Sequence, residues 1–196
     1  DLTIGNYIGD LIENGSTIQL GIGGIPNAAA LALEHKKDLG VHTEMIVDSM
    51  MELYEMGVIT NSEKAFHKGK FVATFSMGSR KLYDWLDDNV AVEFMRGSWV
   101  NHPSILAQNS KMVSINTCLT VDLTGQVGSE SLGPVQYSGT GGQTDTAEGA
   151  AEGFDGKGKS IIASYSTAKH DSISTIGPTL REGTAVPPNQ SLTHNA

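Results

Sequence analysis

The sequence predicts an α/β fold with an open, mostly parallel sheet, flanking helices, and mixed strands after residue 110. Buried apolar stretches alternate with amphipathic helical stretches through residue 88. The strand, helix and strand spacing fits right-handed crossovers between parallel strands. Beyond residue 110, two extended runs are joined by a short turn, which indicates antiparallel or mixed pairing. A chain of 196 residues is long enough to bury a substantial core in one domain.

The elements of the first half follow from hydrophobic periodicity and from helix start and stop signals. Pro26 stands in the first turn of one helical pattern and Gly40 lies past its end, the usual asymmetry of helix termini. In chain order we expect a helix over residues 4–12 that stops at Gly15, a strand over 16–22, a helix over 25–40, a strand over 41–47, a short helix over 50–56, a strand over 70–75 and a helix that begins at Ser79.

The second half of the chain differs in its pattern of extended runs, turns and glycines. Residues 112–127 contain two extended runs, and the sequence DLTG at 122–125 is a good turn between them. Residues 138–160 are rich in glycine and are expected to form a long loop, and 160–170 supplies another strand with a polar exit. We therefore expect one domain over residues 1–183 and an atypical, disordered tail over 184–196.

The charge balance limits the classes of partner. The chain carries 13 basic and 22 acidic residues, a net charge of −9, with a pI near 5.0. A phosphate backbone requires clustered Lys and Arg, and none cluster here, so we expect neither a nucleic-acid partner nor an anionic membrane surface. One locally positive pocket would still accommodate a small anionic ligand.

Cysteine usage and hydropathy predict the compartment. Cys118, the lone cysteine, cannot form an internal disulfide and lies in an apolar stretch, so we expect it in the core. No apolar run approaches the ~20 residues of a membrane span. No signal peptide opens the chain, so we expect a cytoplasmic protein. Because the chain begins at Asp1 rather than Met, we also expect a segment upstream of it.

Two glycine clusters are candidate ligand-binding loops. LGIGGIPNA at 20–28 joins a strand to a helix, where free backbone N–H groups and the helix dipole attract an anion. It is not a phosphate-binding P-loop, and the same pattern also fits an ordinary tight turn. SGTGGQTD at 138–145 is a second cluster, which equally fits a flexible surface loop.

Glu44 is the candidate reactive residue. In the strand over 41–47 it alternates with His42 and Asp48 on one face, and these side chains could simply face water. However, parallel strands bring the glycine loop at 20–28 and the end of the next strand to the same sheet edge, where open α/β sheets bind ligands. Glu44 is therefore expected beside whatever the glycine loop holds.

No metal site is expected. His42, His67 and His102 do not have the spacing of metal ligands, and the tripeptide HTE is not a zinc signature.

Six motifs, taken in order and spacing, resemble the carboxyl-terminal half of the family I CoA-transferases. They are LGIGGIPNA, LGVHTEMIVD, WVNHP, MVSINTCLTVDLTGQVGSESLG, YSGTGGQTD and YSTAK. Within that family the chain is similar to the acetyl-CoA hydrolase/transferase group, which includes 4-hydroxybutyrate and butyrate–acetate CoA-transferases. The resemblance covers roughly residues 1–183.

The resemblance implies a mechanism in which Glu44 is the nucleophile. Glu44 would attack an acyl-CoA thioester to give a mixed anhydride, and the released thiolate would then form a glutamyl-CoA thioester. A second carboxylate, such as acetate, butyrate or 4-hydroxybutyrate, would reverse these steps, so ping-pong kinetics are expected. Coenzyme A and acyl-CoA enter as substrates, and no permanently bound cofactor is implied.

The resemblance also implies roles for other residues. The backbone N–H of Gly142 would stabilise the thioester oxyanion, and Asn101 would lie near the carboxylate site. Leu119 also fits a core position. The positions implied to contact CoA are Gln19, Leu20, Gly21, Ile22, Gly23, Leu119, Gly142 and Lys169.

Two departures from the family leave alternatives open. The family builds its active site between two α/β halves and its members are commonly homo-oligomers, so an N-terminal half is an expected partner and the chain could be a fragment, a proteolysed core or part of a split enzyme. Beyond Gly183 the sequence differs from the family pattern. An acyl-CoA hydrolase on the same scaffold, and a non-catalytic nucleotide-binding domain, are the alternative functions.

Overall fold

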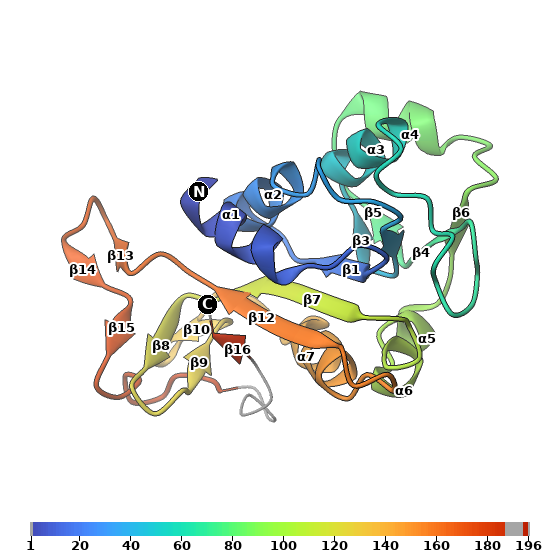
Figure 1. Ribbon diagram of the computed structural model, residues 1–196. Helices are drawn as coiled ribbons and strands as arrows, with labels where there is room; N and C mark the ends of the chain where they lie inside the picture. Colours follow the sequence, from blue (N-terminus) through green and yellow to red (C-terminus); the bar gives the residue numbers. More distant parts are fainter. Residues whose placement is uncertain (1, 187–193, 196) are drawn as a thin grey trace.

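The computed structural model describes residues 2–186 and 194–195, and it has the predicted α/β fold (Figure 1). The helices are α1 (Leu2–Leu11), α2 (Gly24–Leu31), α3 (Asp48–Glu55), α4 (Arg80–Leu86), α5 (Gly97–Val100), α6 (Pro103–Leu106) and α7 (Gln143–Ala151). The strands are β1 (Thr17–Leu20), β2 (Gly40–Val41), β3 (Met45–Ile46), β4 (Phe71–Ala73), β5 (Phe75–Ser76), β6 (Val92–Phe94), β7 (Met112–Thr117), β8 (Thr120–Asp122), β9 (Val127–Gly128), β10 (Ser131–Leu132), β11 (Val135–Gln136), β12 (Lys159–Ala163), β13 (Thr167–Ala168), β14 (Ile173–Ser174), β15 (Ile176–Gly177) and β16 (His194–Asn195).

The central sheet is parallel and has the strand order β16-β12-β7-β1-β2. In the middle strand β1, Ile18 lies opposite Val41 on one side and Val113 on the other. Helices α1 and α2 lie against one face of the sheet, and α7 packs on β7 and β12 at the other face (Figure 1). Covered on both faces, β1 is buried along its whole length, and its polar residues Thr17 and Gln19 are buried together with Ile18 and Leu20.

The strand predicted over residues 41–47 is interrupted at Glu44. The chain first pairs with β1 through β2, then bridges His42 to Val72, and finally pairs with β5 through β3. At the interruption, the carbonyl oxygen of Glu44 accepts hydrogen bonds from the N–H groups of both Thr74 and Phe75, at 3.0 and 3.2 Å. Thr74 and Phe75 therefore lie opposite the single residue Glu44, as in a β-bulge. Such bulges commonly change the direction of a side chain beside a functional site.

The predicted helix over 25–40 is too long, because α2 ends at Leu31 and Gly40 already belongs to β2. Gly40 is required by packing and not by a helix end, since a Cβ atom there would lie 2.6 Å from Lys64 Cγ. The helix predicted from Ser79 is confirmed. Ser79 Oγ accepts the N–H of Leu82 at 3.4 Å as the N-cap of α4.

The prediction of a long loop over 138–160 is also wrong in part, because this segment contains α7. The glycine content there reflects close helix packing. A Cβ atom at Gly149 would lie 2.5 Å from the Cβ of Leu106, so α7 approaches α6 too closely for any larger residue.

The antiparallel pairing predicted after residue 110 is confirmed by the β8–β9 hairpin. Asp122 Oδ1 accepts the N–H groups of Thr124 and Gln126, at 2.9 and 3.0 Å, and so closes the predicted turn. Strands β13 and β14 project from the body as an arm, and β15 returns to pair in parallel with β8 (Figure 1).

The tail predicted over 184–196 falls mostly outside the described residues, which omit 187–193 and 196. Strand β16 pairs in parallel with β12. The division at residue 183 stays a prediction. None of the described helices is long and apolar enough to span a membrane.

Candidate active site

Both glycine clusters and Glu44 line one cavity of about 530 Å³. The loop after β1 and the loop before α7 form its walls, as the shared sheet edge predicts. The structure thus brings together predicted site residues that are far apart in the sequence, namely Gln19, Leu20, Gly21, Ile22, Glu44 and Gly142. Gly23 lines an adjoining cavity of about 350 Å³, which shares Gly21 and Ile22 with the first.

Glu44, Asn101 and Gly142 converge on one point. A Cβ atom at Gly142 would lie 2.5 Å from Glu44 Oε2 and 2.5 Å from Asn101 Nδ2. Only a residue without a side chain fits between the carboxylate and the amide. Gly142 is also the N-cap residue of α7, so its N–H lies at the positive end of the helix dipole.

A buried polar network joins the strand of the first glycine loop to α7. Ser114 Oγ donates to Gln19 Oε1 at 2.8 Å, and Asn116 Nδ2 donates to Ser114 Oγ at 2.9 Å and to Thr146 Oγ1 at 3.2 Å. Thr146 closes the network, because its N–H donates to the carbonyl of Gly142 at 2.9 Å. A buried hydrogen-bond network of this kind fixes the position of the α7 N-terminus.

Of the side chains in this network, the sequence predicted only that of Gln19 as part of the site. The available signal was the alternation in β7, where Ser114 and Asn116 stand two residues apart and thus on the same face of a buried strand. Polar residues repeated on one face of such a strand need internal partners.

Leu119 and Lys169 lie elsewhere, in a separate cavity of about 470 Å³ beside the arm. The same cavity is lined by Arg181, which the sequence did not single out because it follows the last recognised motif. None of the described residues that line this cavity is acidic. In a chain with a net charge of −9 it is a locally positive site.

A family model, described as the acetyl-CoA hydrolase/transferase C-terminal domain, matches residues 78–195. The chain belongs to the acetyl-CoA hydrolase/transferase family. The predicted resemblance to the carboxyl-terminal half of the family I CoA-transferases is thereby confirmed.

Relatives that are 41–51% identical to this family member are named CoA-transferases. The 4-hydroxybutyrate coenzyme A transferase of Clostridium kluyveri is 51% identical over 183 residues, covering 93% of this chain and 42% of the relative. The succinyl-CoA:cyclohexane-1-carboxylate CoA transferase of Geobacter metallireducens is 49% identical over 183 residues, covering 93% and 41%. Acetyl-CoA hydrolases of Kluyveromyces lactis and Candida albicans are more distant, at 29% and 28% identity.

The structure of the family member also superposes on solved structures. RipA from Yersinia pestis matches with a TM-score of 0.91 and 38% identity, over 99% of this chain and 43% of that one. The chain spans about two fifths of the length of the curated relatives it matches.

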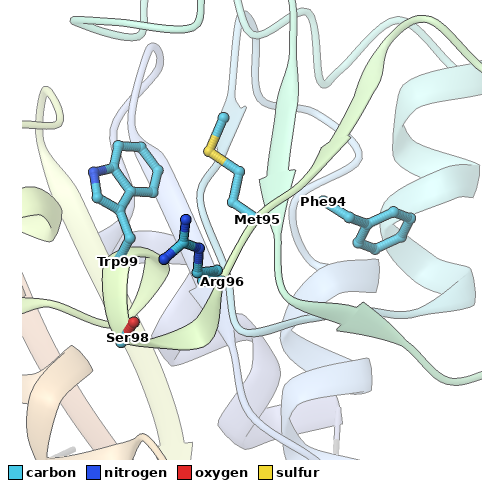
Figure 2. A pocket seen from close by; sticks show the side chains of 5 residues that line it. All are labelled: Phe94, Met95, Arg96, Ser98 and Trp99. Atoms are coloured by element: carbon cyan, nitrogen blue, oxygen red, sulfur yellow. The ribbon is translucent and has the colours of Figure 1, made fainter.

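Another, more open cavity of about 920 Å³ lies beside α5, and none of the predicted site residues lines it. Trp99, Arg96 and Met95 point to the same side of it, whereas Phe94 points away (Figure 2). The indole ring of Trp99 packs 5.8 Å from the imidazole of His42, measured between ring centroids.

Two titratable side chains of this acetyl-CoA hydrolase/transferase domain, those of Lys64 and His42, are fully buried near the segment that carries Glu44. Lys64 Nζ donates to the carbonyls of Val41 and Lys70 at 2.9 and 2.8 Å, and burial lowers the pKa of Lys64 to about 7. Burial also lowers the pKa of His42 to about 4, so its imidazole is neutral at neutral pH. Among residues 2–186 and 194–195, no group of three or more His, Cys, Asp or Glu side chains could hold a metal ion.

Proposed function

We propose that the protein containing this chain transfers CoA between an acyl-CoA and a short-chain carboxylate, such as acetate, butyrate or 4-hydroxybutyrate. The observation that carries the proposal is the convergence of the Glu44 carboxylate and the Asn101 amide on Gly142, at the edge of a cavity that Glu44, Gly142 and both glycine loops line. The CoA-transferase names of the relatives support the same conclusion.

The first half-reaction begins when a carboxylate oxygen of Glu44 attacks the thioester carbonyl. The C–S bond breaks, the electron pair leaves with the CoA thiolate, and a mixed anhydride remains on Glu44. The thiolate then attacks the glutamyl carbonyl, releases the acyl group as a free carboxylate, and leaves a CoA thioester on Glu44. A second carboxylate reverses both steps and leaves as the new acyl-CoA.

Gly142 and Asn101 provide the hydrogen bonds that these steps need. In the proposal, the N–H of Gly142 donates to the oxyanion that forms on the thioester carbonyl, in a field already favourable because of the α7 dipole. Asn101 Nδ2 orients the free carboxylate beside Glu44. Asn101 Oδ1 is buried and has no partner among the described atoms, which leaves it open to a substrate or to the other half of the enzyme.

The test of the proposal is to incubate full-length enzyme with acetyl-CoA and to measure its intact mass. We expect an adduct of CoA that disappears when butyrate is added, with stoichiometric formation of butyryl-CoA. An adduct that is lost to water at the same rate without an acceptor supports the alternative, an acyl-CoA hydrolase, as in the more distant relatives. If the enzyme forms no adduct and does not bind CoA, the remaining alternative is a non-catalytic nucleotide-binding domain.

We propose further that CoA extends from Glu44 towards the positive cavity, where Lys169 and Arg181 hold its phosphates. Changing either residue to Ala should raise the KM for acyl-CoA about tenfold with little change in kcat, because a charge-assisted phosphate contact contributes roughly 1.5–3 kcal/mol at most. Steady-state kinetics measure both constants.

Lys157→Ala is the matched control for these two variants, because Lys157 is exposed and lies on another loop. Its KM should equal that of the unchanged enzyme. Unchanged KM values in both Lys169→Ala and Arg181→Ala would show that the phosphates bind elsewhere.

By family resemblance, the proposal extends to a cytoplasmic homo-oligomer in which an N-terminal half completes the site. Light scattering on full-length protein tests the oligomeric state, and a monomer would contradict it.

A further inference from the structure

His42 is fully buried and lies two residues before Glu44. Its Nε2 lies 2.8 Å from the carbonyl oxygen of Val100, the residue that precedes Asn101. A carbonyl oxygen can only accept, so Nε2 carries the proton and donates it. Nδ1 has no hydrogen-bond partner among the described atoms.

The hydrogen bond to Val100 holds the end of a very short helix. Helix α5 has a single turn, Gly97–Val100, and Asn101 is its C-cap residue. The last carbonyls of a helix have no partner within it, so the carbonyl of Val100 depends on a donor from outside. His42 is that donor.

Two aromatic rings pack against the imidazole of His42 and restrict its position. The rings of Trp99 and Phe66 pack against it with centroid distances of 5.8 and 5.9 Å. Trp99 belongs to α5 itself, as Figure 2 shows, so the helix contacts His42 through a ring and through a hydrogen bond. This packing restricts both the rotation of the imidazole and the position of α5.

The backbone of His42 is fixed in the sheet. Its N–H donates to the carbonyl of Ile18 at 3.2 Å, and it bridges Val72 on the other side. The same short segment therefore places the Glu44 carboxylate in the cavity and, through the His42 ring, also fixes the position of Asn101.

We propose that His42 is a positioning residue, which holds the Asn101 amide at the working distance from Glu44 through its Nε2–H hydrogen bond to Val100. The inference rests on the proposed CoA-transferase function. The imidazole itself does not exchange protons with the reacting groups, because Nε2 is occupied by Val100 and the ring is buried.

The test compares His42→Gln with His42→Leu and His42→Asn in the full-length enzyme. The amide nitrogen of Gln can reach the place of Nε2 and donate to Val100, whereas Leu has no donor and the shorter Asn does not reach. Displacement of Asn101 by about 1 Å should cost on the order of 100-fold in kcat. We expect that loss in the Leu and Asn variants, a KM for acyl-CoA within about threefold of normal, and recovery of most of kcat in His42→Gln.

A double-mutant cycle separates positioning from general destabilisation. If His42 acts through Asn101, adding His42→Leu to Asn101→Ala should lower kcat by less than about twofold, because the interaction is already lost. His35→Leu, at an exposed position, should leave kcat unchanged.

Three results would overturn the inference. They are an unchanged kcat in His42→Leu, a kcat of His42→Gln as low as that of His42→Asn, and losses that multiply with Asn101→Ala. If the Leu variant does not fold, the comparison of Gln with Asn decides alone. Failure of the proposed function is distinguishable, because Glu44→Gln would then retain activity whatever His42 does.

Discussion

Glu44→Gln is expected to abolish CoA transfer, with a loss in kcat of roughly a thousandfold or more, since it removes the nucleophile and not a supporting contact. Gln keeps the size and the hydrogen-bonding reach of the side chain but is far too weak a nucleophile to open a thioester. Binding of CoA should persist, because the glycine loops and the positive cavity are unchanged. The measurements are steady-state transfer from acetyl-CoA to butyrate and intact mass, which should show no CoA adduct.

Glu34→Gln is the matched control, because Glu34 is exposed and lies outside the cavities described above. It should transfer CoA at the normal rate and form the adduct. Glu44→Asp adds a geometric test, since one methylene fewer withdraws the carboxylate from the point where Asn101 and Gly142 meet, and a shift of about 1 Å costs roughly 100-fold. Full transfer activity in Glu44→Gln would remove the basis of the proposed mechanism.

The sequence could predict the neighbours of Glu44 because they depend on local pattern and on a general rule of topology. The extended run over 16–22 indicated β1, the glycines after it indicated the loop, and parallel strands end at one edge of the sheet. What local pattern could not predict is the break at Glu44. That break arises from the two N–H groups of Thr74 and Phe75, about thirty residues along the chain, which share one carbonyl.

The residues that support the site, Ser114, Asn116 and Thr146, were missed for a similar reason. They lie in β7 and α7, far along the chain from the predicted Gln19 in β1, and only the folded sheet shows that these side chains meet. Helix α7 was missed because the glycines in and around it indicate a loop in isolation, whereas Gly149 within the helix is the residue that close packing on α6 requires. Tertiary packing overrides local propensity at both places.

The environment of His42 is another feature that local sequence pattern could not predict. On the alternation of the predicted strand it shares a face with Glu44, and both could have faced water. In the structure the imidazole is fully buried and bonded to Val100, whereas Glu44 is half-buried and lines the cavity. The bulge separates their environments, so strict alternation fails where the candidate site begins.

The second large effect is expected from Gly142→Ala. The backbone of Gly142 has φ −97° and ψ 6°, which alanine can adopt, so backbone strain is small and the effect is steric. The new methyl group would stand 2.5 Å from both Glu44 Oε2 and Asn101 Nδ2, and both side chains must move away from the oxyanion position. We expect kcat to fall by about 100-fold to 1000-fold, as when an oxyanion donor is lost.

Stability separates this explanation from a simple folding defect. Crowding by one methyl group against the ends of two side chains should cost about 1–3 kcal/mol of unfolding free energy at most, which leaves the enzyme folded in the assay. Gly139→Ala is the matched control in the same loop, because a Cβ atom there meets nothing within 4 Å. Its kcat should fall far less.

The rate of adduct formation then identifies the step affected. Because the oxyanion forms when Glu44 attacks the thioester, Gly142→Ala should slow formation of the CoA adduct in a single turnover by the same factor as kcat. Equal losses in the Gly139 and Gly142 variants would mean that loop mobility, and not the space between Glu44 and Asn101, limits the reaction. A normal adduct rate in Gly142→Ala would mean that another donor stabilises the oxyanion, and the N–H of Gly142 would then have no part in catalysis.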